Sequence, residues 1–242
     1  MTKLAVIGGS GLVQLEGMNI IRRERVETPY GEPSSSLVHG ELEGVALVFL
    51  PRHGDEHTIP PHKVNYRANI FALQQAGVED VIAIAAVGGI HEDMVPGVIA
   101  IPDQIIDYTW GRKHTFFEDE QNPVTHIDFT RPYSERLRKA LRTAASKTGL
   151  DIINGGTYGA THGPRLETAA EIQRMQRDGC TMVGMTGMPE AALACELELS
   201  YACCAVSANR AAGLSPGGIS MADIQSTLAT AMENIKRLLS AL

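Results

Sequence analysis

The sequence lacks long apolar runs. Nothing in its 242 residues approaches the ~20 consecutive apolar residues that a membrane-spanning helix requires. The apolar stretch from Leu4 to Ile7 near the N-terminus is too short for a signal peptide and runs directly into a glycine-rich turn. We therefore expect a soluble, cytoplasmic protein that has no membrane partner.

Positive charge and cysteine are also scarce. The chain has 21 Lys and Arg against 28 Asp and Glu, and its net charge of −7 argues against general affinity for a nucleic-acid backbone. None of the four cysteines forms a CxxC pair, so we expect no structural zinc. Each is predicted to be a buried free thiol: Cys180, Cys195, Cys203 and Cys204.

One histidine-rich stretch invites a metal interpretation. It reads His53-Gly54-Asp55-Glu56-His57, which is not the HExxH order of zinc proteases, and no second group of ligands accompanies it. We expect neither a metal nor an organic cofactor.

Short apolar runs alternate with longer segments of helical periodicity. Val81 to Val87 is apolar at successive positions, which is typical of a strand buried on both faces of a sheet. Further strands are predicted at 4–7, 44–50, 98–106, 155–161, 182–185 and 201–207, and helices at 66–76, 133–147, 167–177, 189–199 and 222–239. The length suits one domain, residues 1–242. We predict a single-domain α/β fold with a mixed sheet covered by helices on both faces.

Residues 107–130 interrupt this alternation with an irregular segment rich in aromatic residues and histidine. A long loop inside a compact domain is usually functional or takes part in assembly. The alternative is a surface excursion that carries a small cluster of its own.

Polar groups that suit phosphate follow several of the predicted strands. Ser10 lies in the turn Gly8-Gly9-Ser10-Gly11, whose glycines let backbone amides approach an anion. This turn is neither a GxGxxG dinucleotide motif nor a Walker A loop. Arg52 and His53 follow the strand 44–50, and Thr186 follows 182–185, so all can meet at one edge of the sheet. Alternatively, Arg52 pairs with a carboxylate and Thr186 caps a helix.

Several longer motifs resemble the methylthioadenosine phosphorylase branch of the purine nucleoside phosphorylases. They are VIGGSG at 6–11, PRHG at 51–54, HTIPPHKVNYRAN at 57–69, GPR at 163–165 and MTGMPE at 185–190. The resemblance implies a mixed-sheet phosphorylase fold, usually a homotrimer, acting on a small-molecule nucleoside with inorganic phosphate as co-substrate. It implies phosphate bound by Ser10, Arg52, His53, Thr186 and the backbone near Ala86, with Met185 against the ribose. The chain departs from these relatives at Ala85, where a Thr often contacts phosphate.

Two positions in the implied base pocket favour a 6-oxopurine over adenine. Adenine-specific relatives carry two Asp residues where this chain has Asn209 and Ala211, and an Asn can donate to O6 of the base and accept from a protonated N7. Glu167 stands where 6-oxopurine enzymes have a Glu that accepts from N1–H, and Leu166 replaces an aromatic residue that stacks on the base. For Glu167 alone, the alternative is an acid in the first turn of a helix.

The pocket for the 5' group is expected near the start of the last helix. Met221 and Ile224, on either side of Asp223, offer an apolar surface for a methylthio group, and His126 is expected to approach from the neighbouring subunit. Ordinary helix packing is the alternative for Met221 and Ile224.

Together these residues predict phosphorolysis of S-methyl-5'-thioinosine to hypoxanthine and 5-methylthioribose 1-phosphate, with Asn209 as the catalytic residue that stabilises the departing base. Alternatives in the same family are a methylthioadenosine phosphorylase and a general inosine or guanosine phosphorylase. A purine-binding regulator without chemistry and a dinucleotide oxidoreductase are alternatives of a different class.

Overall fold

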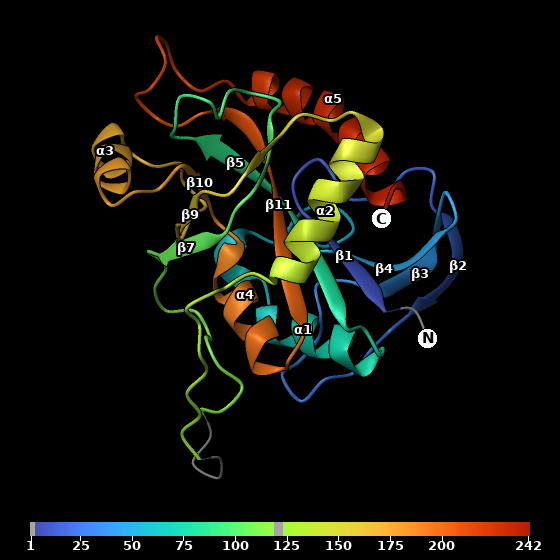
Figure 1. Ribbon diagram of the computed structural model, residues 1–242. Helices are drawn as coiled ribbons and strands as arrows, with labels where there is room; N and C mark the ends of the chain where they lie inside the picture. The colour runs from blue at the N-terminus through green and yellow to red at the C-terminus, as the bar shows by residue number, and fades with distance from the viewer. Residues whose placement is uncertain (1–2, 119–122) are drawn as a thin grey trace.

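The computed structural model describes residues 3–118 and 123–242, and within these ranges eleven strands form one mixed sheet (Figure 1). The strands are β1 (Leu4–Gly8), β2 (Asn19–Glu24), β3 (Leu37–Leu42), β4 (Val45–Pro51), β5 (Asp80–Gly89), β6 (Ile99–Ile101), β7 (Gln104–Asp107), β8 (Ile152–Asn154), β9 (Thr157–Ala160), β10 (Met182–Gly184) and β11 (Ser200–Arg210). The main path through the sheet runs β2-β3-β4-β1-β5-β10-β9-β7, and β11, β6 and β8 branch from β5.

Strand β5 is the centre of the sheet. It pairs in parallel with β1 along its first half and with β11 along its whole length, and its last two residues pair with β10. Because β4 is also parallel to β1, the four strands β1, β4, β5 and β11 all point the same way. Their carboxyl ends therefore meet at one edge, where open α/β sheets usually bind ligands.

Helices cover both faces of the sheet, as alternate residues of the strands show. Ala5 and Ile7 of β1 pack with α1 (Tyr66–Gln75) and α4 (Gly187–Glu196), whereas Val6 packs with α2 (Glu135–Thr148) and α5 (Met221–Ser240). The short helix α3 (Ala169–Arg177) packs against β10, and a single 3-10 turn spans Pro61–Lys63. Figure 1 shows α1 and α4 together below the sheet and α2 and α5 together on its other side. The predicted fold class is confirmed.

Several predicted boundaries are wrong. The strand expected at 98–106 is two strands, because Pro102 has no N–H for a sheet ladder and the chain there leaves β8 and β11 to join β9. The helix expected from residue 167 begins at Ala169, since Thr168 is its N-cap and forms a capping box with Glu171. Strands β2, β3 and β8 were not predicted; β2 is exposed at all but its last residue, so it has no apolar alternation to detect.

Candidate active site

A cleft of about 780 Å³ opens where the parallel strands end. That size suits a small-molecule ligand. It brings together, from segments far apart in the sequence, all of the predicted site residues except His126 and Asp223. Those on its wall are Ser10, Arg52, His53, Ala86, Leu166, Glu167, Met185, Thr186, Asn209, Ala211, Met221 and Ile224.

The glycine turn after β1 closes tightly over its neighbours. A Cβ added to Gly8 would lie 2.2 Å from the carbonyl oxygen of Leu12, and one added to Gly9 would lie 2.6 Å from the carbonyl oxygen of Ile84. Only glycine permits so close a backbone approach. The turn presents Ser10 to the cleft, with its hydroxyl 3.3 Å from Nε2 of His57.

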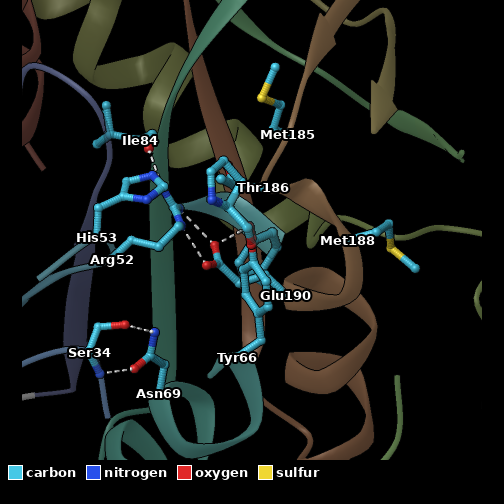
Figure 2. Close-up of polar contacts among 12 residues, drawn as sticks. Ser34, Arg52, His53, Tyr66, Asn69, Ile84, Met185, Thr186, Met188 and Glu190 are labelled. Atoms are coloured by element: carbon cyan, nitrogen blue, oxygen red, sulfur yellow. Dashed lines mark hydrogen bonds and ion pairs between the residues drawn. The ribbon is translucent and has the colours of Figure 1, made fainter. Parts of the chain in front are cut away.

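Arg52, at the end of β4, is held by a buried acid (Figure 2). Its Nε and Nη2 donate to the two carboxylate oxygens of Glu190 at 2.7 and 2.8 Å, and its Nη1 donates to the Ile84 carbonyl at 3.0 Å. Burial alone would lower the pKa of Arg52, but the Glu190 carboxylate holds it above the ordinary value. The sequence left open that Arg52 pairs with a carboxylate. The structure shows this pairing for the Nε and Nη2 edge of the guanidinium. Since Arg has five N–H donors, two remain for a ligand.

His53 is neutral and oriented. Its Nδ1 lies 2.8 Å from the Ile59 carbonyl, which can only accept, so the ring proton is on Nδ1. Burial, with a further contribution from the charge of Arg52, lowers the pKa of His53 to about 4. At neutral pH its Nε2 is therefore an unprotonated acceptor.

Met185 and Thr186 form the wall between β10 and α4. Thr186 is the N-cap residue of α4, yet its side chain makes no capping hydrogen bond, so the alternative role as a helix cap is not the one observed. Thr186 is one of the residues that line the cleft. Arg112 fixes the backbone of this wall, because its Nη1 donates to the carbonyl of Met185 at 2.9 Å and also to that of Met188.

Asn209 reaches the cleft because β11 bulges there. Its pairing with β5 shifts register between Ser207 and Asn209, and a bulge of this kind turns a side chain away from regular alternation. The Asn209 amide nitrogen donates to the carbonyl of Arg210 at 2.6 Å. Ala211, two residues on, is buried and leaves the wall without a carboxylate at that position.

Glu167 also lines the cleft and lies in the loop before α3. It precedes the N-cap Thr168, so the alternative interpretation as an acid in the first helical turn is wrong; Glu171 has that place. Glu171 also forms an ion pair with Arg165, whose Nη2 donates to Oε1 of Glu171 at 2.7 Å. The carboxylate of Glu167 accepts instead from the hydroxyl of Thr161 at 2.6 Å.

The predicted residues of the 5' pocket separate in space. Met221 and Ile224, at the start of α5, line the cleft. Asp223 faces an adjoining hollow of about 250 Å³, and its backbone N–H donates to the capping hydroxyl of Ser220. His126 is exposed and lies outside the wall of the cleft in its own chain.

The irregular segment 107–130 is anchored to the body of the fold at several points. Phe116 is buried against Tyr30, with the ring centroids 5.0 Å apart, and belongs to the main core cluster, so the segment packs onto the core and has no separate cluster among its described residues. Arg112 links it to the site wall, and Trp110 stacks on His162 at 3.9 Å while remaining 68% exposed. Residues 119–122 of this segment lie outside the described part of the chain.

Neither Glu190 nor Thr161 was predicted as a site residue. Glu190 is fully buried and accepts from Tyr201 as well as from Arg52. An acid followed by the apolar run Ala191 to Cys195 was the available signal, because a buried carboxylate needs a partner. Thr161 follows β9 directly, in the same position relative to its strand as the residues that were predicted.

Comparison with known proteins places the chain in one family. The model of the Phosphorylase superfamily matches residues 3–242. A probable S-methyl-5'-thioinosine phosphorylase from Pseudomonas syringae pv. tomato is 54% identical over 240 residues, which cover 99% of this chain and 98% of that protein. A 6-oxopurine nucleoside phosphorylase from Pyrococcus furiosus is 46% identical and is covered over 92% of its length. Among solved structures, methylthioadenosine phosphorylase from Schistosoma mansoni in complex with adenine superposes with a TM-score of 0.94 at 32% identity, covering 100% of this chain and 91% of that one.

The chain belongs to the phosphorylase superfamily. It is an enzyme of the nucleoside phosphorylase type, a pentosyltransferase. Within the described residues, none of its helices is both long and apolar enough to cross a bilayer.

Proposed function

We propose that this enzyme cleaves S-methyl-5'-thioinosine with phosphate, giving hypoxanthine and 5-methylthioribose 1-phosphate. The observation that carries the proposal is that Glu167 and Asn209 line one cleft while Ala211 leaves it without an adenine-directed carboxylate. Hypoxanthine carries an acceptor at O6 and a donor at N1, whereas adenine carries a donor and an acceptor. A carboxylate and an amide match the first arrangement, and mismatched buried polar groups are costly.

The reaction separates charge, and the cleft has groups suited to each part. As the glycosidic bond lengthens, the sugar becomes positive and the departing purine negative. Phosphate against the anomeric carbon stabilises the sugar and then attacks it, while hydrogen bonds from Asn209 strengthen as charge develops on the base. Positioning and electrostatics supply the catalysis, so no covalent intermediate with the enzyme is required.

Phosphate is assigned to the end of the cleft formed by Ser10, Arg52, His53, Ala86 and Thr186. Arg52 offers its two remaining N–H groups, and Ser10 and Thr186 offer hydroxyls. His53 has a free Nε2 that can only accept, so it binds the hydroxyl of a protonated phosphate. Met185 lies where the ribose would bind, and Leu166 where the base would lie.

The 5'-methylthio group is assigned to Met221 and Ile224, whose apolar side chains match a thioether. The family resemblance further leads us to propose a homotrimer in which His126 of one subunit completes the site of the next. In this trimer, the exposed segment that carries His126 would form part of the contact between subunits.

A substrate panel tests the proposal. We expect kcat/KM for S-methyl-5'-thioinosine with phosphate to exceed that for S-methyl-5'-thioadenosine by about 100-fold or more, since the wrong base leaves buried polar groups unpaired. The ratio of kcat/KM for S-methyl-5'-thioinosine to that for inosine measures the contribution of the methylthio group. A preference for the adenine nucleoside would overturn the base assignment and favour a methylthioadenosine phosphorylase; equal use of inosine would favour a general 6-oxopurine enzyme.

A further inference from the structure

Among the described residues, the Glu167 carboxylate accepts a hydrogen bond from the hydroxyl of Thr161. Its Oγ1 lies 2.6 Å from Oε1 of Glu167 and 3.3 Å from the Gly184 carbonyl oxygen. A hydroxyl has one proton, and the shorter contact to an ionised acceptor is the stronger hydrogen bond. Thr161 therefore donates to Oε1 of Glu167, and no hydrogen bond to Oε2 of that carboxylate is made within residues 3–118 and 123–242.

Thr161 is itself held firmly. It is 8% exposed, its backbone N–H donates to Gly184 of β10 at 2.8 Å, and its carbonyl accepts from Arg112 at 3.3 Å. A β-branched side chain on a fixed backbone has few rotamers, so the direction of this hydroxyl is set in advance. Thr161 does not itself line the cleft, whereas Glu167 does.

Glu167 would be poorly oriented without this contact. It lies in the loop before α3, outside the helical hydrogen bonds, and the nearby cation Arg165 is paired with Glu171. A flexible Glu side chain loses conformational entropy when a ligand fixes it, and a hydrogen bond made in advance removes part of that cost.

We propose that Thr161 is a positioning residue that sets the base selectivity of this enzyme by fixing Glu167 to accept from N1–H of a 6-oxopurine. The inference rests on the proposed function, because only a 6-oxopurine presents N1–H. Adenine presents an acceptor at N1, and a carboxylate fixed against it is repelled, so the same contact favours one base and disfavours the other.

The test compares Thr161→Val, which keeps the shape and removes the hydroxyl, with Thr161→Ser, which keeps the hydroxyl. We expect Thr161→Val to lower kcat/KM for S-methyl-5'-thioinosine by about 10- to 100-fold, the value of a hydrogen bond to a charged group. For S-methyl-5'-thioadenosine we expect a change of less than about threefold, or a gain. Thr161→Ser should stay within about threefold of the wild type on both. The adenine nucleoside thus serves as the control for folding.

A double-mutant cycle shows whether Thr161 acts through Glu167. In a Glu167→Ala background, Thr161→Val should have no further effect on the 6-oxopurine substrate, since coupled residues are non-additive. Additive losses, or equal losses on both nucleosides, would overturn the positioning role. These failures are distinct from failure of the proposed function, which the wild-type preference alone decides: a wild type that prefers the adenine nucleoside overturns both proposals.

Discussion

In the folded protein, the imidazole of His53 lies in a buried environment that disfavours its charged form. It is 5% exposed, and burial next to Arg52 lowers its pKa from 6.5 to about 4. A His with a depressed pKa in the folded state binds fewer protons there than in the unfolded chain. Its contribution is therefore fully present above pH ~6.5 and lost as the pH falls towards ~4, by up to about 3 kcal/mol.

We expect the free energy of unfolding, measured by urea titration without phosphate, to fall steadily between pH 6.5 and pH 4. His53→Gln should flatten this dependence, leaving the part due to His57, whose pKa burial also lowers. An unchanged slope in the variant would show that other groups produce the acid sensitivity.

Residue identities in the site were visible in the sequence, whereas their long-range partners were not. The predicted residues that line the cleft stand at strand ends or in recognisable motifs. They include Ser10, Arg52, His53, Thr186, Glu167 and Asn209. The pairing of Arg52 with Glu190 joins residues 138 positions apart, and no spacing rule reports such a contact. The same holds for the tautomer of His53, which depends on one carbonyl in a turn.

At the scale of elements, the ion pair between Arg52 and Glu190 joins the end of β4 to α4. Both side chains are at most 1% exposed. Removing one partner of such a pair leaves the other charge buried and unpaired. We expect Glu190→Gln to lower the free energy of unfolding by about 3–5 kcal/mol. It should also weaken phosphate binding, because the guanidinium loses the contact that orients it.

A matched control is Glu79→Gln, which breaks the exposed pair with Lys3, whose side chains are 67% and 61% exposed. Exposed pairs contribute about 0–1 kcal/mol, so denaturant titration should separate the two variants clearly. Similar losses for both would mean that the buried pair contributes no more than a surface one.

Elements were predictable where burial leaves a pattern. Strand β5 is buried along most of its length and was predicted from its continuous apolar run. Strand β2 is exposed, so its position depends on hydrogen bonds to β3 and not on its own residues. The break between β6 and β7 follows from topology, because two short strands join different branches of the sheet.

At the scale of the whole molecule, His126 is the predicted site residue that lines neither the cleft nor the hollow beside it. His126 belongs to the exposed segment after β7, which runs out from the body of the fold in Figure 1. If three 26.0 kDa subunits assemble in a ring, a heterologous contact places this segment of each subunit against the next. His126 would then complete a neighbour's 5' pocket.

Mixed assemblies distinguish a neighbour's His126 from a residue acting within its own chain. We expect His126→Ala to lower kcat/KM for the methylthio nucleoside by about 10-fold, a usual loss for one pocket contact. Asn209→Ala should abolish turnover within its own subunit. When the two variants are unfolded together and refolded at equal concentration, a site with native Asn209 and a native neighbouring His126 reappears in about a quarter of positions if subunits assort randomly in a closed ring. Activity of the mixture should therefore exceed the average of the separately refolded variants. If His126 served its own subunit, every site would keep one defect, and mixing would yield only that average.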